Sequence, residues 1–432
     1  MNQPNIATPY LKMHRGTRLH FIHTLSRLRD QIAAGEVLHP DHSYTPDVWD
    51  ETPFTLAALA GIRNSVVIVH AVPEYARGSY SPKLGGARVF FTQSEGGERG
   101  SSGAESIKDA LALAIARHHP QVVFILSPAE DIDPAAILAA TNPAENIRIV
   151  PIATDNQPSR IPYGGYDRAL QAILTQLVGA KKADDRRFVN LVSLTNSMAD
   201  LVEVTGLLHD LGVGANPLPL FATPAGLDRA ANALATLVLN PDAGGYFARG
   251  LEERHAVPYL SLDLPIGLRA TRRFLAGVGK ALGKEAEALA YAEKRESERR
   301  DHQLLRGKRV FLGTNLAAAV GLTELIHDSG GEVAGLALPV LDSTNHHLLE
   351  RLEGLAGTIP VLLGPGQHPA LTTILRRVKP DYYFGPFDVS LAASMGVRPF
   401  AFESVTVYGY AGFDAINQAL QQPASKRWVG AA

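Results

Sequence analysis

The chain has 432 residues, of which 46% are hydrophobic and 19% are charged, and its formal net charge is -2 at pH 7. These values are typical of a soluble globular protein of about three domains, and they exclude the clustered positive charge that non-specific nucleic-acid binding needs. The sequence contains no cysteine, which excludes disulfides and thiolate-based zinc or cluster sites. It contains neither a signal-peptide core nor a run of about 18 apolar residues, so we expect a cytoplasmic protein.

Short apolar runs of strand length alternate with helical patterns along most of the chain. We expect strands at residues 65–70, 88–92, 122–126, 147–152, 188–192, 217–221, 309–312, 332–338, 357–363, 382–384 and 399–402. These runs are almost continuous in Val, Ile, Leu and Phe, which is typical of strands buried on both faces of a parallel sheet. Before the helix expected at 201–211, Ser197 and Asp200 have the spacing of a capping box. The predicted fold class is therefore α/β, with doubly wound, Rossmann-like domains.

Two polar segments predict domain boundaries. One is the run at 179–187, after which a new strand begins, and the other is a long charged helix expected at 281–305, which is typical of a solvated connecting helix. The predicted division is an N-terminal arm and helix over 1–45, with the helix at 19–33, followed by α/β domains over 46–185, 186–305 and 306–432.

Several strand-to-helix turns are polar and rich in glycine, at 193–197, 312–315 and 363–366. In open α/β sheets ligands bind beyond the carboxyl ends of the strands, where helix N-termini offer N–H groups to anions. The same residue types are also ordinary turn and cap residues, so both interpretations stay open. No complete G-x-G-x-x-G follows a strand, and no Walker A, H-E-x-x-H or G-x-S-x-G sequence is present, so neither a nucleotide site, a metal site nor a serine hydrolase is predicted.

Seven segments in chain order carry a resemblance to a known family. They lie at 57–70, 94–111, 164–167, 244–259, 265–271, 379–381 and 408–413. The sequence LEERHAVPY at 251–259 is similar to Leu/Met-Glu-Glu-Arg-x-Gly-Ile-Pro-Tyr, and YGYAGF at 408–413 is similar to a C-terminal Gly-Tyr-x-Gly. Together they resemble the nitrogenase component 1 family, which includes the MoFe protein subunits, their cofactor-assembly homologues and the light-independent protochlorophyllide and chlorophyllide reductases. The resemblance implies three Rossmann-like domains with parallel sheets around a central cleft.

The chain departs from this family at each place where the family has a metal ligand. The sequence HAVPEY at 70–75 stands where the family has His-Gly-Pro-x-Gly-Cys, so that Tyr75 replaces a cysteine. Ser127 replaces the cysteine of a Cys-Pro pair, Ala248 replaces a cofactor-ligating cysteine, and Tyr408 replaces a cofactor-ligating histidine. Because clusters are held by thiolates, none can be bound by this chain through cysteine. Glu74 offers one carboxylate as a ligand, and one branch of the family uses an Asp to bind its cluster. One hard ligand cannot replace three thiolates.

The resemblance implies an oxidoreductase subunit, nitrogenase-like or tetrapyrrole reductase-like, in a heteromeric, ATP-dependent complex. Its partners would be a homologous component 1 subunit, in an α2β2-like heteromer that holds any iron–sulfur cluster or metallocofactor, and a nitrogenase iron-protein-like ATP-dependent reductase. The alternatives are a redox-inactive paralogue that binds a cofactor or tetrapyrrole or acts as a scaffold or assembly protein, and an unrelated protein that shares only the fold. The pocket candidates are His70, Glu74, Tyr75, Ser127, Ala248, Arg249 and Tyr408.

Each pocket candidate also has a structural interpretation. His70 ends a buried strand, and a histidine in such a place is more often hydrogen-bonded within the fold than a ligand. Tyr75 and Tyr408 are typical packing aromatics with a polar tip. Arg249 has helix spacing to Glu252 and Glu253 and is expected to pair with one of them. Ser127 and Ala248 are explained by a turn and by packing.

Overall fold

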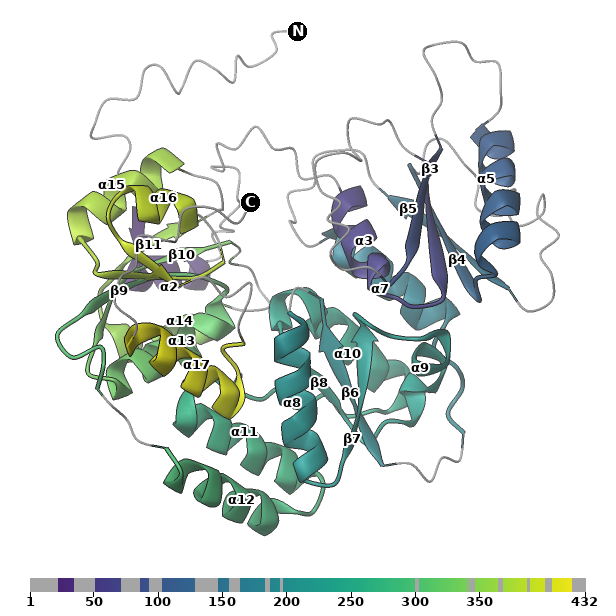
Figure 1. Cartoon of the computed structure of the whole chain (residues 1–432). Coiled ribbons are helices and arrows are strands. Elements are labelled where there is room, and N and C mark those ends of the chain that lie inside the picture. Colours follow the sequence, from purple (N-terminus) through teal and green to yellow (C-terminus); the bar gives the residue numbers. More distant parts are fainter. Residues whose placement is uncertain are drawn as a thin grey trace, which may run out of the picture. The chain divides into compact units, whose positions relative to one another are not determined.

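The protein is described by a computed structural model in which two compact units are distinguished (Figure 1). The described residues are 22–34, 51–70, 86–92, 103–128, 147–154, 164–182, 187–194, 197–299, 303–339, 341, 346–363, 368–386, 389–400 and 406–421. Unit 1 contains Met1–Pro46, Asp263–Leu275 and Leu289–Ala432, and unit 2 contains Asp47–Leu262 and Ala276–Ala288. None of the helices in the described ranges is both long and apolar enough to cross a membrane.

Unit 2 begins with a four-stranded parallel sheet in the order β3-β2-β4-β5. Its strands are β2 (Ser65–His70), β3 (Arg88–Thr92), β4 (Val122–Pro128) and β5 (Arg148–Thr154). Helices α3 (Glu51–Ala60) and α7 (Gly164–Gln176) cover one face and α5 (Gly103–His118) covers the other (Figure 1). Side chains alternate between the faces, so Val67 and Val69 join the core under α3 and α7 while Val66 and Ile68 pack under α5. Both faces of the central strand β2 are thereby buried, as its continuous apolar run predicted, whereas the edge strand β3 is partly exposed.

The second sheet of unit 2 is parallel, with β6 between β7 and β8. Its elements are β6 (Phe188–Ser193), α8 (Met198–Asp210), β7 (Gly214–Pro219), α9 (Pro224–Asp228), the 3-10 helix η4 (Arg229–Asn232), β8 (Thr236–Val238) and α10 (Pro241–His255). Buried amides lie in this sheet: Asn216 Nδ2 donates to Asn190 Oδ1 at 3.0 Å and to Gly226 O at 2.9 Å. The capping box is confirmed, since Asp200 N donates to Ser197 Oγ at 3.2 Å and Ser197 N donates to Asp200 Oδ2 at 2.9 Å.

Unit 1 contains a six-stranded sheet in the order β1-β11-β10-β9-β12-β13, in which only β1 runs antiparallel to its neighbour. The strands are β1 (Ile22–Thr24), β9 (Arg309–Gly313), β10 (Glu332–Leu338), β11 (Pro360–Leu363), β12 (Tyr382–Phe384) and β13 (Arg398–Phe400). The helices with them are α2 (Leu25–Ala33), α13 (Leu316–Asp328), α14 (Leu348–Ala356), α15 (His368–Val378), α16 (Val389–Ser394) and α17 (Gly409–Gln421). Residues of α15 and α16 form the core on one face of this sheet.

Two helices expected from the sequence are divided differently in the structure. The helix expected at 19–33 is β1 followed by α2, because Ile22–Thr24 pairs with β11. The bounds expected for the long charged helix at 281–305 are also wrong. Instead, α11 (Gly267–Ala281) ends where the charged run begins, and α12 (Glu285–Ser297) is a separate helix. Gly283 has a φ of +69°, a left-handed conformation that breaks the helix between them.

The α/β class with parallel sheets is therefore confirmed. The division into three domains stays a prediction.

Candidate functional site

A row of buried polar side chains follows the carboxyl edge of the first sheet of unit 2. His70, Thr92 and Thr154 end β2, β3 and β5, and Ser127 is the next-to-last residue of β4. Their side chains are between 1% and 9% exposed. Because the four strands are parallel, their carboxyl ends meet at one edge, which is where ligands bind in open α/β sheets.

The strand order places two of the predicted pocket residues at the switch point of this sheet. β2 comes first in sequence, β3 lies on one side of it and β4 on the other, so successive connections diverge from β2. The last register pair between β2 and β4 joins Val69 to Leu126, and His70 and Ser127 are the next residue on each strand. The structure thus brings His70 and Ser127 together at the point where doubly wound sheets open to a ligand.

Thr92 is a partner of His70 that sequence analysis missed. Its Oγ1 lies 2.6 Å from His70 Nδ1, and the two residues are paired in the register of β2 and β3. A short hydrogen bond to one ring nitrogen fixes the orientation of an imidazole and the tautomer that it adopts. The only signal in the sequence was that both residues end predicted strands.

By the same alternation Thr154 lies on the opposite face of the sheet from His70 and Ser127, where it contacts α3. Thr52 Oγ1 donates to Thr154 Oγ1 at 3.0 Å, and Thr55 Oγ1 donates to Gly165 O at 2.9 Å. A Cβ added at Gly165 would lie 2.1 Å from Glu51 O, so α3 and α7 approach more closely than any larger residue allows. These contacts fix the first turns of both helices against the edge of the sheet.

Ala248 and Arg249 lie in α10 and differ in exposure. Ala248 is fully buried and belongs to the hydrophobic core of unit 2, whereas Arg249 is exposed. Within the described residues Arg249 forms no ion pair with Glu252 or Glu253, contrary to the structural interpretation. Its Nη1 would be 3.4 Å from a Cβ at Gly245, so the guanidinium lies back along the helix.

Tyr259 lies close enough to Arg249 to be affected by its charge. Burial raises the pKa of the Tyr259 phenol, and a hydrogen bond with Ser261 and the charge of Arg249 partly oppose that increase. An arginine and a tyrosine with a raised pKa are groups that can donate to an anionic or carbonyl oxygen.

Tyr408 lies in unit 1, immediately before α17. Its side chain is 4% exposed, and its backbone forms an antiparallel bridge with Ile266. Gly409, which follows it with a φ of +63°, donates its N–H to Pro265 O at 2.6 Å. Tyr408 therefore has a backbone position set by the 265–267 turn. The remaining candidates, Glu74 and Tyr75, lie outside the described residues.

Residues 55–425 match the family model described as "Nitrogenase component 1 type Oxidoreductase". The chain belongs to this family. Its similarity to curated relatives is partial: it is 30% identical to a light-independent protochlorophyllide reductase subunit of Jannaschia sp. (strain CCS1) over 265 residues, which is 57% of this chain and 49% of that protein. The corresponding subunit of Halorhodospira halophila is 37% identical over 145 residues, 32% of this chain and 27% of that protein. The chain thus spans about half the length of the first of these relatives and about a quarter of the second.

Solved nitrogenase structures share the fold of this nitrogenase component 1 type chain. The structure "Nitrogenase Cp1 at pH 5" aligns with a TM-score of 0.73 and 17% identity, covering 96% of this chain and 97% of that chain. The structure "Nitrogenase Cp1 at pH 6.5" gives a TM-score of 0.72 and 17% identity, covering 90% and 96%. At this identity the likeness establishes the fold alone.

The donor atoms of this family member do not fit an iron–sulfur cluster. Such clusters are held chiefly by thiolates, and the sequence has no cysteine. At the switch point the polar side chains are a serine with its hydroxyl and a histidine whose Nδ1 is hydrogen-bonded to Thr92. Over the described ranges no three His, Asp or Glu side chains gather as a metal site. The edge of this sheet is therefore suited to hydrogen bonding rather than to soft-metal ligation.

Proposed function

We propose that this chain is a subunit of a heteromeric, ATP-dependent reductase complex and lines a substrate or cofactor pocket without holding a metal cluster itself. Membership of the nitrogenase component 1 type family and similarity to subunits of light-independent protochlorophyllide reductases support the complex. The observation that carries the proposal is the buried polar row at the switch point, which keeps hydrogen-bonding groups where thiolates are missing.

In this proposal some of the candidate residues form hydrogen bonds with a ligand, and others determine the shape of the pocket. His70, oriented by Thr92, and Ser127 present polar atoms to a ligand at the edge of the sheet. In unit 2 Arg249 contributes a cation, while Ala248 keeps α10 closely packed. In unit 1 Tyr408 contributes a phenol. Glu74 and Tyr75 follow His70 in the sequence and belong to the same proposed pocket.

The proposed partners are a homologous component 1 subunit and a nitrogenase iron-protein-like reductase that delivers electrons at the expense of ATP. Any iron–sulfur cluster or metallocofactor would be held by the homologous subunit, because thiolates must come from outside this chain. A cytoplasmic location is part of the same proposal.

The test is anaerobic co-expression of the chain with each homologous component 1 subunit encoded beside it, followed by affinity purification and measurement of iron per heteromer. We expect a stable heteromer whose iron disappears when the cysteines of the other subunit are replaced by serine. We also expect that His70→Leu in this chain leaves the iron content unchanged. Iron bound by this chain when purified alone, or failure to form any heteromer, would contradict the proposal.

A second candidate is favoured by the same absence of soft donors. A redox-inactive paralogue that binds a cofactor or tetrapyrrole, or that acts as a scaffold or assembly protein, also needs a polar pocket and no cluster. It is distinguished by adding protoporphyrin IX to the chain purified alone and following absorbance and fluorescence. Saturable binding that His70→Leu weakens would favour this alternative.

A further inference from the structure

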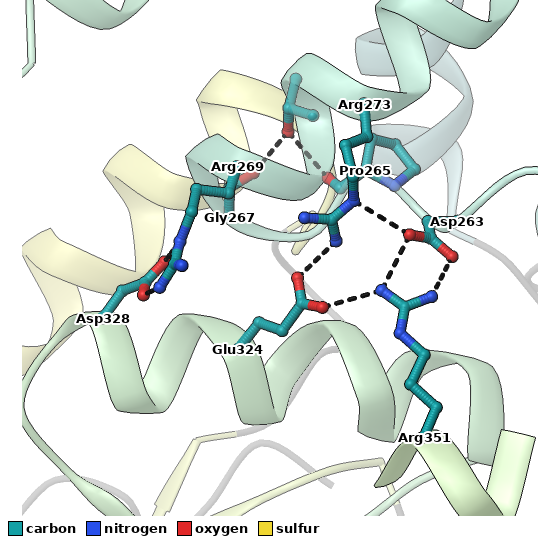
Figure 2. Close-up of polar contacts among 9 residues, drawn as sticks. Asp263, Pro265, Gly267, Arg269, Arg273, Glu324, Asp328 and Arg351 are labelled. Carbon is teal, nitrogen blue, oxygen red and sulfur yellow. Dashed lines mark hydrogen bonds and ion pairs between the residues drawn. The ribbon is translucent and has the colours of Figure 1, made fainter. Parts of the chain in front are cut away.

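Four charged side chains of alternating sign form a closed ring in unit 1 (Figure 2). Arg351 Nη2 lies 2.9 Å from Asp263 Oδ2 and 2.7 Å from Glu324 Oε1, and Arg351 Nη1 also bonds Asp263. On the other side, Arg273 Nε donates to Asp263 Oδ2 at 3.1 Å and Arg273 Nη2 donates to Glu324. Each arginine thus bridges the same two carboxylates, which come from different segments of the chain.

The ring is more strongly coupled than an ordinary surface ion pair. Isolated exposed pairs contribute little to stability, whereas networks with bidentate arginine geometry contribute more. The side chain of Glu324 is only 13% exposed, and those of Asp263 and Arg351 are 31% and 35% exposed. Loss of Arg351 would leave two carboxylates, one of them largely buried, facing the single charge of Arg273.

The ring lies directly before a turn that holds the backbone of Tyr408. Asp263 is followed two residues later by Pro265, whose carbonyl accepts the N–H of Gly409 at 2.6 Å. Ile266 forms the antiparallel bridge with Tyr408. The hydroxyl of Thr271 donates to Gly267 O at 2.7 Å and lies 3.2 Å from Pro265 O, so it holds the two ends of the turn together from inside.

The same turn is packed against α13, the helix that supplies Glu324. A Cβ at Gly321 would lie 2.9 Å from Ile266 Cβ, so Ile266 rests directly on the backbone of α13. Gly267, with a φ of +80°, lies against Leu325, which is the neighbour of Glu324. The position of α13 therefore fixes the position of the 265–267 turn, and the ring fixes Asp263 to α13 and α14.

We propose that Asp263, Arg273, Glu324 and Arg351 are positioning residues for Tyr408, acting through the 265–267 turn and its hydrogen bond to Gly409. The proposal rests on the proposed function only in treating Tyr408 as a pocket residue. The placement of the Tyr408 backbone by the ring is a property of unit 1 itself and is measured without any ligand.

The test compares two arginines that each form an ion pair with α13: Arg351 of α14, inside the ring, and Arg269 of α11, outside it. Arg351→Met breaks the ring. Arg269→Met removes the exposed pair that Arg269 forms with Asp328, in which Nε donates to Oδ2 at 2.7 Å, and this pair joins α11 to α13 without touching the turn (Figure 2). The readout is residue-resolved hydrogen exchange of the Gly409 amide, with amides of β4 in unit 2 as an internal reference.

We expect Arg351→Met to speed exchange of the Gly409 amide by about fivefold or more, while Arg269→Met changes it by less than about twofold. Arg351→Lys keeps the charge but not the bidentate geometry, so it should give an intermediate rate and replaces the methionine variant if that variant does not fold. High salt should speed Gly409 exchange in the wild type, because half-exposed ion pairs are screened.

Equal effects of Arg351→Met and Arg269→Met, or an unchanged Gly409 amide in Arg351→Met and Arg351→Lys, would overturn the positioning role. Faster exchange at β4 to the same extent as at Gly409 would also overturn it, since that pattern reports general destabilisation. The ring could pass this test in a chain that binds no ligand and forms no heteromer. That result would refute the proposed function and leave the positioning role of the ring intact.

Discussion

The bond between His70 and Thr92 gives the sharpest prediction about the candidate site. Thr92→Val replaces the hydroxyl by a methyl group of similar size, so the cavity is unchanged and only the 2.6 Å hydrogen bond to His70 Nδ1 is lost. A net hydrogen bond contributes about 1 kcal/mol, and removing one partner of a buried group costs about 1–3 kcal/mol. Since His70 is 9% exposed and Thr92 is 7% exposed, we expect a loss of about 1–2 kcal/mol in the free energy of unfolding.

The assay is a double-mutant cycle of Thr92→Val and His70→Leu, with urea unfolding followed by circular dichroism. The slope with denaturant must stay constant, so that a change of midpoint reports stability. Removing either partner loses the same bond, so the double variant should be more stable than the sum of the single effects predicts, by about 1 kcal/mol or more.

A matched control is Thr154→Val, which removes the bond that Thr52 donates on the other face of the same sheet. β5 is two strands away from β2, a separation of about 10 Å, so the effects of Thr154→Val and His70→Leu should add to within about 0.5 kcal/mol. Additivity of Thr92→Val with His70→Leu would refute the claim that Thr92 holds the imidazole.

Three further outcomes are expected. Gly165→Ala forces a methyl group into Glu51 O and should lower the free energy of unfolding by about 1–3 kcal/mol in a urea titration. Gly206 lies in the helix α8, where an added Cβ would meet no atom within 4 Å outside the helix backbone. Gly206→Ala should therefore raise the free energy of unfolding by up to about 1 kcal/mol. Burial alone would raise the pKa of Asp263, but the guanidinium groups of Arg351 and Arg273 outweigh burial and lower this pKa. The Asp263 carboxylate therefore contributes to stability above the ordinary carboxylate pKa, and this contribution is lost as pH falls through the lowered pKa. In thermal unfolding, Asp263→Asn should therefore be less stable than the wild type at pH 7, and the difference in melting temperature should narrow in acid. A difference in melting temperature that is the same at every pH would contradict this sign.

The sequence by itself determined the elements that are defined by local pattern. β2, β3, β10 and β12 have the bounds that their apolar runs predicted. For β2, which is buried along its whole length, the reason is that a strand buried on both faces must be apolar throughout. The capping box at Ser197 was predicted for a similar reason, since its two bonds join residues three apart in the chain. Family motifs spread over the chain likewise indicated the nitrogenase component 1 type, which the match over 55–425 confirmed.

Only the tertiary structure decided the features that depend on pairing between distant segments. β1 and β8 were not predicted as strands from the sequence, and they are strands because β11 and β6 offer them partners. The His70–Thr92 bond depends on the register of β2 with β3, which no single strand specifies.

The charged ring was equally invisible in the sequence, because Asp263 and Arg351 meet only after α13 and α14 have packed. The ends of β2, β3, β10 and β12 could be predicted from local composition, whereas β7 and β11 have other bounds than predicted. Which side chains touch at those ends was set by the order and register of the sheet, because these alone determine which distant segments become neighbours.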